Sequence, residues 1–295
     1  MTKEKFCKEL MEMVKTYLPK KKKPLVEMLK VNKGDNKYTG LVLKKEDNGP
    51  VPVVNLDLAY SEHKKGTDME TLAKDALAIM AVSPPDINAV KIAETFEEAA
   101  PYLMLRIMNA AKNAKYLENV PHRTWSDLAV VCDVRMLTMN NSFSCVVTND
   151  LLDKWQVSED EAFAAAQANM AKQCMHDDLD AVLSRLMGEA PGPPHPDAPR
   201  LVFVSVEDRW HGAAAITLQE TLKEMSTILG GCFYILPSSV HETLCVPENT
   251  GKSPNLQELK QMVVKTNKEK VSKEEWLSDN IYLYDPETDT VSIAA

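Results

Sequence analysis

Glycine is scarce in this chain of 295 residues, which contains 10 glycines against 17 prolines and 15 methionines. Neither GxxxxGK[ST] nor GxGxxG occurs, and the one Gly-Gly pair is Gly230-Gly231. Both motifs need glycines so that backbone N–H groups can approach phosphates closely. The sequence therefore argues against nucleotide binding through a glycine-rich loop, and no cofactor is predicted.

The chain also lacks the patterns typical of metal sites, disulfide frameworks and membrane segments. Its six cysteines form no CxxC pair, and no second pair of ligands at zinc-site spacing accompanies Cys174, His176 and Asp177. No apolar run is long enough to span a membrane. The first ten residues, MTKEKFCKEL, are charged where a signal peptide is apolar. We therefore expect a cytoplasmic protein with no bound metal and no membrane segment.

Positive charge is concentrated near the N-terminus. Residues 1–45 contain 13 lysines and 5 acidic residues, which gives them a net charge of +8. Because the net charge of the whole chain is -9, the remaining 250 residues have a net charge of -17. The overall charge disfavours nucleic-acid binding. This basic head could nevertheless contact a nucleic acid or another anionic partner through its lysine run, which consists of Lys20, Lys21, Lys22 and Lys23.

Apolar periodicity predicts an α+β fold, in which repeated ββα units form antiparallel sheets covered by helices. The segment 102–109 is either a strand or a continuation of the short helix before it. The other predicted strands are 25–31, 38–43, 51–56, 127–137, 142–148, 201–206, 211–217, 232–236, 242–246, 281–284 and 290–293. The longer predicted helices are 3–18, 57–65, 69–82, 149–155, 159–173, 177–187, 218–229 and one that starts at Pro254, and a short helix is predicted at 273–277.

Several helix starts carry recognisable capping residues. Asn149 is expected to cap the helix that follows it. The other signals are boxes with Ser or Thr three residues before Glu, namely Thr67/Glu70, Thr95/Glu98, Ser158/Glu161, Thr217/Glu220 and Ser272/Glu275.

A proline-rich segment suggests a division of the chain. Residues 188–199, GEAPGPPHPDAP, contain five prolines and two glycines, a composition that favours an extended linker. We therefore predict an N-terminal α+β part at 1–187, a linker at 188–199 and a C-terminal α+β part at 200–295.

The string from 236 to 242, LPSSVHE, contains a possible nucleophile, base and carboxylate. Ser238 or Ser239 could act with His241 and Glu242, or with a carboxylate from elsewhere in the chain. No GxSxG elbow surrounds the serines. The simpler interpretation is that a serine caps a turn and that His241 bonds a local carbonyl group.

A second string, Asp208-Arg209-Trp210-His211, lies at a predicted hairpin turn. Exposed Trp and Arg dominate the energetics of many protein interfaces, so this turn is a candidate binding surface. The alternative is a hairpin whose tryptophan folds over the edge of a sheet. The loop 121–125, PHRTW, has similar chemistry.

Several strings resemble an uncharacterised bacterial family from gut-dwelling anaerobic Firmicutes, classed as a domain of unknown function. The most specific is 233–242, FYILPSSVHE, and another is 277–285, LSDNIYLYD. The stretches VPH at 120–122 and VTND at 147–150 are also similar to it. The resemblance implies a bacterial origin. It carries over no catalytic residues, because the family has no established activity.

The leading functional hypothesis is a non-catalytic interaction or accessory protein whose partner is a protein. It rests on the lack of a complete catalytic or cofactor motif in the sequence. One alternative is a hydrolase that uses a Ser/His pair around Ser239 and His241. The other is a binder of nucleic acid or another anionic partner through the basic head.

Overall fold

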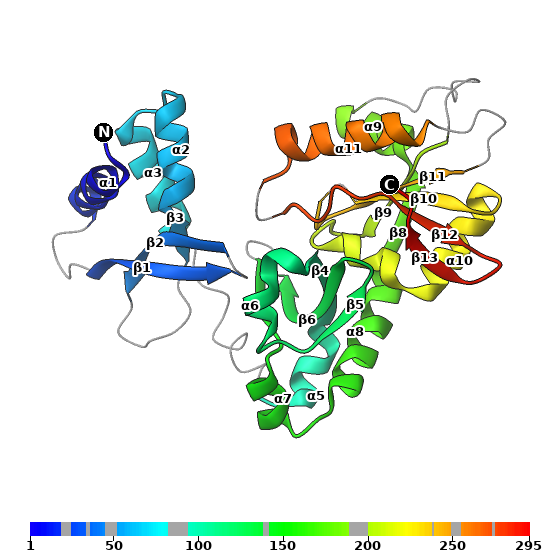
Figure 1. Cartoon of the computed structure of the whole chain (residues 1–295). Helices are drawn as coiled ribbons and strands as arrows, with labels where there is room; N and C mark the ends of the chain where they lie inside the picture. The colour runs from blue at the N-terminus through cyan, green and yellow to red at the C-terminus, as the bar shows by residue number, and fades with distance from the viewer. Residues whose placement is uncertain are drawn as a thin grey trace. The chain divides into compact units, whose positions relative to one another are not determined.

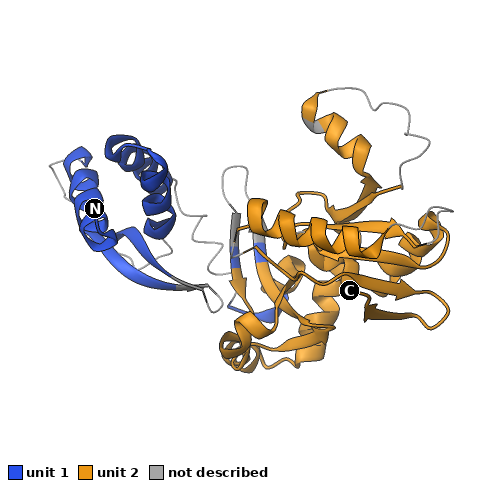
Figure 2. Ribbon diagram, turned by 45° about the horizontal axis from the view of Figure 1, so that its top comes forward, with its two compact units in different colours: residues 1–98, 135–144 blue, residues 99–134, 145–295 orange. Residues whose placement is uncertain are grey.

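A computed structural model describes most of the chain, and its residues cluster into two compact units. The described residues are 1–18, 25–33, 36–44, 52–81, 94–137, 142–188, 200–237, 239–248, 255–272 and 275–295. Unit 1 contains residues 1–98 and 135–144, and unit 2 contains residues 99–134 and 145–295 (Figure 2). Each unit is described by itself.

Unit 1 is a three-stranded antiparallel meander with helices on one face of the sheet (Figure 1). The core between helices and sheet contains Phe6, Leu10, Leu41, Leu56 and Ala73, all fully buried. The elements are α1 (Lys3–Tyr17), β1 (Leu25–Lys33), β2 (Asn36–Lys44), β3 (Val53–Asn55), α2 (Leu56–Lys65) and α3 (Met69–Ala81).

Side chains at the helix ends explain where these helices start and stop. Asn55 accepts hydrogen bonds from the first backbone N–H groups of α2, and Gly66, with φ of 113°, ends that helix. A left-handed residue at this position is common because glycine adopts it without strain. Asp68, rather than the predicted Thr67, accepts the bond from Thr71 N at the start of α3.

Unit 2 contains two sheets. In the smaller one, β6 pairs antiparallel with β4 and β5, and β7 also pairs with β6. Residues 135–144, which include the end of β6 and the start of β7, are grouped with unit 1. The strands are β4 (Leu103–Asn109), β5 (His122–Trp125), β6 (Leu128–Leu137) and β7 (Ser142–Val146).

The larger sheet of unit 2 has six strands in the order β13-β12-β10-β11-β9-β8, and every pair is antiparallel. The helix α11 packs on it, because Val263 lies in one apolar cluster with Leu236 and Val246. The strands are β8 (Cys174–Asp178), β9 (Val202–Val206), β10 (Phe233–Pro237), β11 (Thr243–Pro247), β12 (Tyr282–Asp285) and β13 (Thr290–Ile293).

The helices of unit 2 connect these strands. The short ones are α5 (Phe96–Ala99), which begins in unit 1, η1 (Ala100–Tyr102), η2 (Ala111–Asn113), α6 (Ala114–Leu117) and η3 (Gly212–Thr217), of which the three η elements are 3₁₀ helices. The longer ones are α7 (Asn149–Trp155), α8 (Glu159–Gln173), α9 (Leu179–Met187), α10 (Gln219–Leu229) and α11 (Leu256–Lys270).

The α+β class with antiparallel sheets is therefore confirmed, and segment 102–109 is the strand β4. The repetition of ββα units is not confirmed. The predicted division at 188–199 stays a prediction, and residues 189–199 lie outside the described residues. The strands on either side of that segment, β8 and β9, are neighbours in one sheet.

Some element predictions were wrong. The segment 211–217 is not a strand, because residues 212–217 form η3. Residues 275–280 are not helical, although Ser272 and Glu275 make the contacts of a capping box. Thr148, rather than Asn149, caps α7, and Thr217 bonds Ala214 O instead of capping α10. The predicted box at Ser158 and Glu161 is confirmed at α8.

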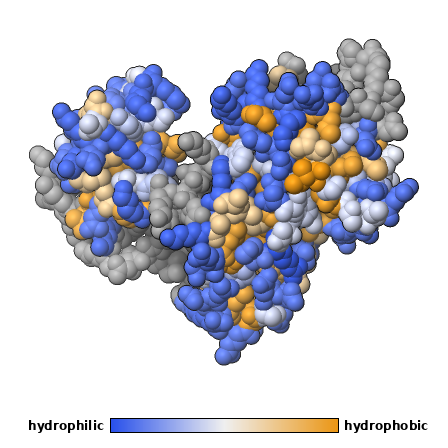
Figure 3. Space-filling model, viewed as in Figure 1, coloured by the Kyte–Doolittle hydropathy of each residue, from blue (hydrophilic) through white to orange (hydrophobic). Residues whose placement is uncertain are grey.

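On the face shown in Figure 3, hydrophilic side chains cover much of the region of α11, interrupted by small hydrophobic patches. Met262 and Val264 are the more exposed apolar residues of that helix. In the part of the chain that the structure describes, every helix is too short or too polar to cross a membrane.

Candidate functional site

The two strings singled out in the sequence meet in unit 2. After β9 the chain turns sharply, with Arg209 and His211 both in the left-handed region at φ of 59° and 57°. The His211 N–H then donates to Nδ1 of His241, over 3.1 Å. The two imidazole rings stack with 5.6 Å between their centroids, and the rings of Trp210 and His211 stack at 4.8 Å. His211 is therefore buried against the turn that carries His241, whereas Asp208 at the start of the segment is exposed.

A hydrogen-bonded turn holds His241 between β10 and β11. The hydroxyl group of Ser239 accepts from His241 N over 3.1 Å and donates to Oε1 of Glu242 over 2.8 Å. The carbonyl oxygen of His241 accepts from Oγ of Ser205, which is fully buried, over 2.7 Å. Both the backbone and the ring of His241 are thus fixed.

Glycine at position 212 allows η3 to approach β9 and this turn. A Cβ atom at Gly212 would collide with Oγ of Ser205, and it would lie 2.6 Å from Val206 N and 2.8 Å from His241 O. Two of these three neighbours are backbone atoms, which cannot move aside as the end of a side chain can. The close packing of η3 therefore requires glycine here.

The second nitrogen of His241 faces a carboxylate. Nε2 lies 3.4 Å from Oε1 of Glu275, and the two side chains are 26% and 44% exposed. Since Nδ1 accepts a backbone N–H, we assign the proton of the neutral ring to Nε2, which donates toward Glu275. Solvent can therefore reach this pair.

Glu275 is positioned by the segment that follows it. Its carbonyl oxygen accepts from Val240 N over 3.0 Å. Farther along, Asn109 donates to Leu277 O over 2.7 Å. Asp127 accepts a further set of bonds, from Ser278 Oγ at 2.8 Å, Asn280 Nδ2 at 3.1 Å and Tyr282 Oη at 2.5 Å. Burial, together with the bond to Asp127, raises the pKa of Tyr282, so this hydroxyl stays a donor.

A buried ion pair lies behind His211. Asp133 of β6 accepts from Nε and Nη2 of Arg106, at 2.7 and 3.1 Å, and its side chain is 3% exposed. Burial disfavours the charged guanidinium, but the charge of Asp133 raises the pKa of Arg106 above its ordinary value. Asp133 also lies near His211, since Nδ1 of His211 is 3.9 Å from Oδ2 of Asp133.

The structure thus brings His211, His241, Ser239 and Glu242 close together, whereas Ser238 lies outside the described residues. Asp208 accepts a hydrogen bond from Trp210 N over 2.8 Å. Ser239 does not lie at the imidazole, because the ring nitrogens of His241 face His211 N and Glu275. Within the described residues, His, Cys, Asp and Glu form no group of three that could hold a metal ion.

The sequence-based reasoning did not identify three members of this cluster, Asp133, Arg106 and Glu275. Asp133 could have been identified from the sequence, because it is the one carboxylate in an otherwise apolar strand segment, VVCDV at 130–134. A charge in such a strand is expected to be paired. Glu275 was interpreted only as part of a capping box, which its second oxygen does form, with Ser272 Oγ at 3.0 Å.

Replacing Ser239 by alanine tests whether its hydroxyl group supports the turn. The variant loses the bond to Glu242 and the acceptor for His241 N, so we expect the free energy of unfolding to fall by about 1–2 kcal/mol. Urea unfolding of wild type and Ser239→Ala measures this. An unchanged midpoint would show that the turn does not depend on the hydroxyl group.

Comparison with protein-family models matches residues 3–286 to a family of unknown function (DUF5688), so the chain belongs to that family. No match was found among the curated proteins or among the solved structures.

Proposed function

Starting from membership of a family without a described activity, we propose that this protein is an enzyme that performs general acid–base catalysis, of the hydrolase class, at the His241–Glu275 pair. The observation that carries the proposal is the contact between Nε2 of His241 and Oε1 of Glu275, beside the buried group of His211, Asp133 and Arg106. A half-exposed carboxylate fixed by a neutral imidazole is an arrangement that can move protons.

The energetic cost of the cluster supports a functional role. Burying an Arg–Asp pair costs several kcal/mol of desolvation per ion, which the attraction between the charges only partly offsets. Apolar side chains of similar size would stabilise the fold at least as well. Ionisable groups gathered despite that cost are candidates for functional sites. Here they come from five regions of the chain, around residues 106, 133, 211, 241 and 275.

The geometry favours Glu275 as the base and water as the nucleophile. Nδ1 of His241 accepts the His211 N–H, so a second proton on this ring would break that bond. In the proposed reaction, Glu275 takes a proton from the attacking water and then returns it to the leaving group. His241 holds the carboxylate in place through Nε2–H. This division of labour, a carboxylate base beside a neutral histidine, has precedent in other enzymes.

The test is a panel of chromogenic esters, phosphates and glycosides, assayed with wild type and with Glu275→Gln. We expect hydrolysis of at least one compound class and a loss of about 100-fold or more in Glu275→Gln, in the range of positioned acid–base groups. The matched control is Glu224→Gln, because Glu224 also lies 3.0 Å from a histidine, His176, but on the surface. Equal rates in wild type and Glu275→Gln would contradict the proposal.

The other predicted roles remain predictions. If Ser239 is a nucleophile, a fluorophosphonate probe should label the wild type and not Ser239→Ala. If a protein partner docks on residues 208–211, affinity purification should recover that partner reproducibly. If the basic head contacts an anionic partner, the protein should be retained on heparin. Its lysines at 20–23 lie outside the described residues. Cytoplasmic location and bacterial origin also remain predictions.

A further inference from the structure

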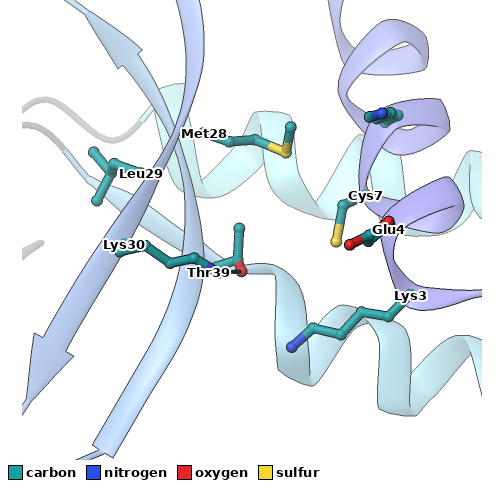
Figure 4. Close-up of a pocket in the computed structure, with 8 residues that line it drawn as sticks. Lys3, Glu4, Cys7, Met28, Leu29, Lys30 and Thr39 are labelled. Carbon is teal, nitrogen blue, oxygen red and sulfur yellow. Dashed lines mark hydrogen bonds between the residues drawn. The ribbon is translucent and has the colours of Figure 1, made fainter.

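A pocket of about 530 Å³ opens in unit 1 between the start of α1 and the strands β1 and β2 (Figure 4). Cavities of about 300–1,000 Å³ are typical of sites for small organic ligands. This pocket is far from the residues of the acid–base cluster in sequence, and all its lining residues belong to unit 1. It is therefore a separate candidate binding site.

The polar part of the lining carries an excess of positive charge. Lys3, Lys8 and Lys30 line the pocket together with one carboxylate, that of Glu4. Lys3 is balanced by Asp57, at 2.6 Å. Lys30 instead donates to a neutral group, Oγ1 of Thr39, over 3.1 Å, so this bond fixes the amine without cancelling its charge. The lining as a whole favours an anion.

The rest of the lining is apolar. Met28 extends from β1 across the pocket toward Cys7 of α1 (Figure 4). Met28 is 37% exposed, although it lies on a strand next to a helix. Burial raises the pKa of the Cys7 thiol, so Cys7 contributes a neutral wall rather than a competing thiolate. Pockets with a mostly apolar wall and a few polar groups bind ligands of the same mixed character.

We propose that this pocket binds a small aliphatic carboxylate, with its charged end at Lys8 and Lys30 and its hydrocarbon chain along Met28 and Cys7. The excess of lysine in the lining favours an anionic group at one end of the ligand. The exposed Met28 favours a hydrocarbon chain at the other end. The site is independent of the acid–base function proposed above.

The full-length protein, labelled with ¹³C at the methionine methyl groups, provides the test. Its Met28 signal is assigned from the spectrum of Met28→Leu. We expect hexanoate to shift this signal saturably in the millimolar range, and hexanol, which has no charge, to bind more weakly.

Two variants of α1 separate a charge effect in the pocket from a general change in charge. Lys8→Glu changes a lysine that lines the pocket, whereas Lys5→Glu changes one that faces Glu9, at 3.7 Å, and does not line it. We expect hexanoate affinity to fall about two- to fivefold in Lys8→Glu, the range of one exposed ion pair, and to stay unchanged in Lys5→Glu. An unmoved Met28 signal, equal binding of hexanol, or equal effects of the two variants would each overturn the proposal.

Discussion

Asp133→Ala is expected to lower the free energy of unfolding by about 3–5 kcal/mol, the cost of breaking a buried ion pair from one side. The substitution leaves Arg106 charged, with 15% of its side chain exposed and both of its bonds to Asp133 lost. Asp133→Asn is expected to cost less, since the amide oxygen can still accept one bond.

The matched control is Asp160→Ala. Asp160 also accepts from an arginine, Arg123, at the same distance of 2.7 Å, but its side chain is 91% exposed. An exposed ion pair contributes about 0–1 kcal/mol. Equilibrium unfolding in urea should therefore separate the buried Arg106–Asp133 pair, which has two hydrogen bonds, from the exposed Arg123–Asp160 pair, which has one. If both variants lose the same stability, the Arg106–Asp133 pair is not desolvated as described.

The fold could be predicted from the sequence wherever a local signal decides the outcome. Ser158 and Glu161 form the reciprocal bonds of a capping box, and α8 begins at the residue they predict. The apolar-rich segments 25–31 and 38–43 likewise predict two neighbouring strands, and β1 and β2 pair with each other. In both places a local feature of the sequence, a capping box or a short apolar run, indicates the structure.

The prediction failed at 211–217 for a physical reason. Residues Gly212–Ile216 are all buried, so no polar face gives the segment a period that distinguishes a strand from a helix. Glycine and three alanines are small enough to lie against β9 in either conformation. What selects the 3₁₀ helix is tertiary packing, including the contact of Ala213 N with Val240 O, which joins residues far apart in sequence.

The candidate site shows the same limit. The strings at 208–211 and 239–242 could be chosen by residue type, but the distance between them could not be predicted. The carboxylates that face the two histidines come from β6 and from the segment after Ser272. Such convergence depends on sheet order and on the anchoring of that segment by Asp127, neither of which leaves a local pattern.

Gly212→Ala is expected to have the second large effect, a loss of about 3 kcal/mol or more, at the upper end of the cost of overpacking a close-packed interior. The added methyl group meets Oγ of Ser205, and it meets the backbone at Val206 N and His241 O. Thermal and urea unfolding measure the loss. Gly230→Ala is the control, because Gly230 has φ of 82° and open space around it, so its substitution costs only the conformational strain of about 1–2 kcal/mol.

A double variant identifies the atoms responsible. Ser205→Ala removes the hydroxyl group that the new methyl group meets first, but it leaves the two backbone contacts and also removes the bond to His241 O. Gly212→Ala with Ser205→Ala should therefore recover little of the lost stability. Full recovery would mean that only a side-chain clash matters at this position. Because the same packing fixes the turn that carries His241, the glycine variant should also lose the acid–base activity proposed for Glu275, even in the fraction of molecules that stays folded.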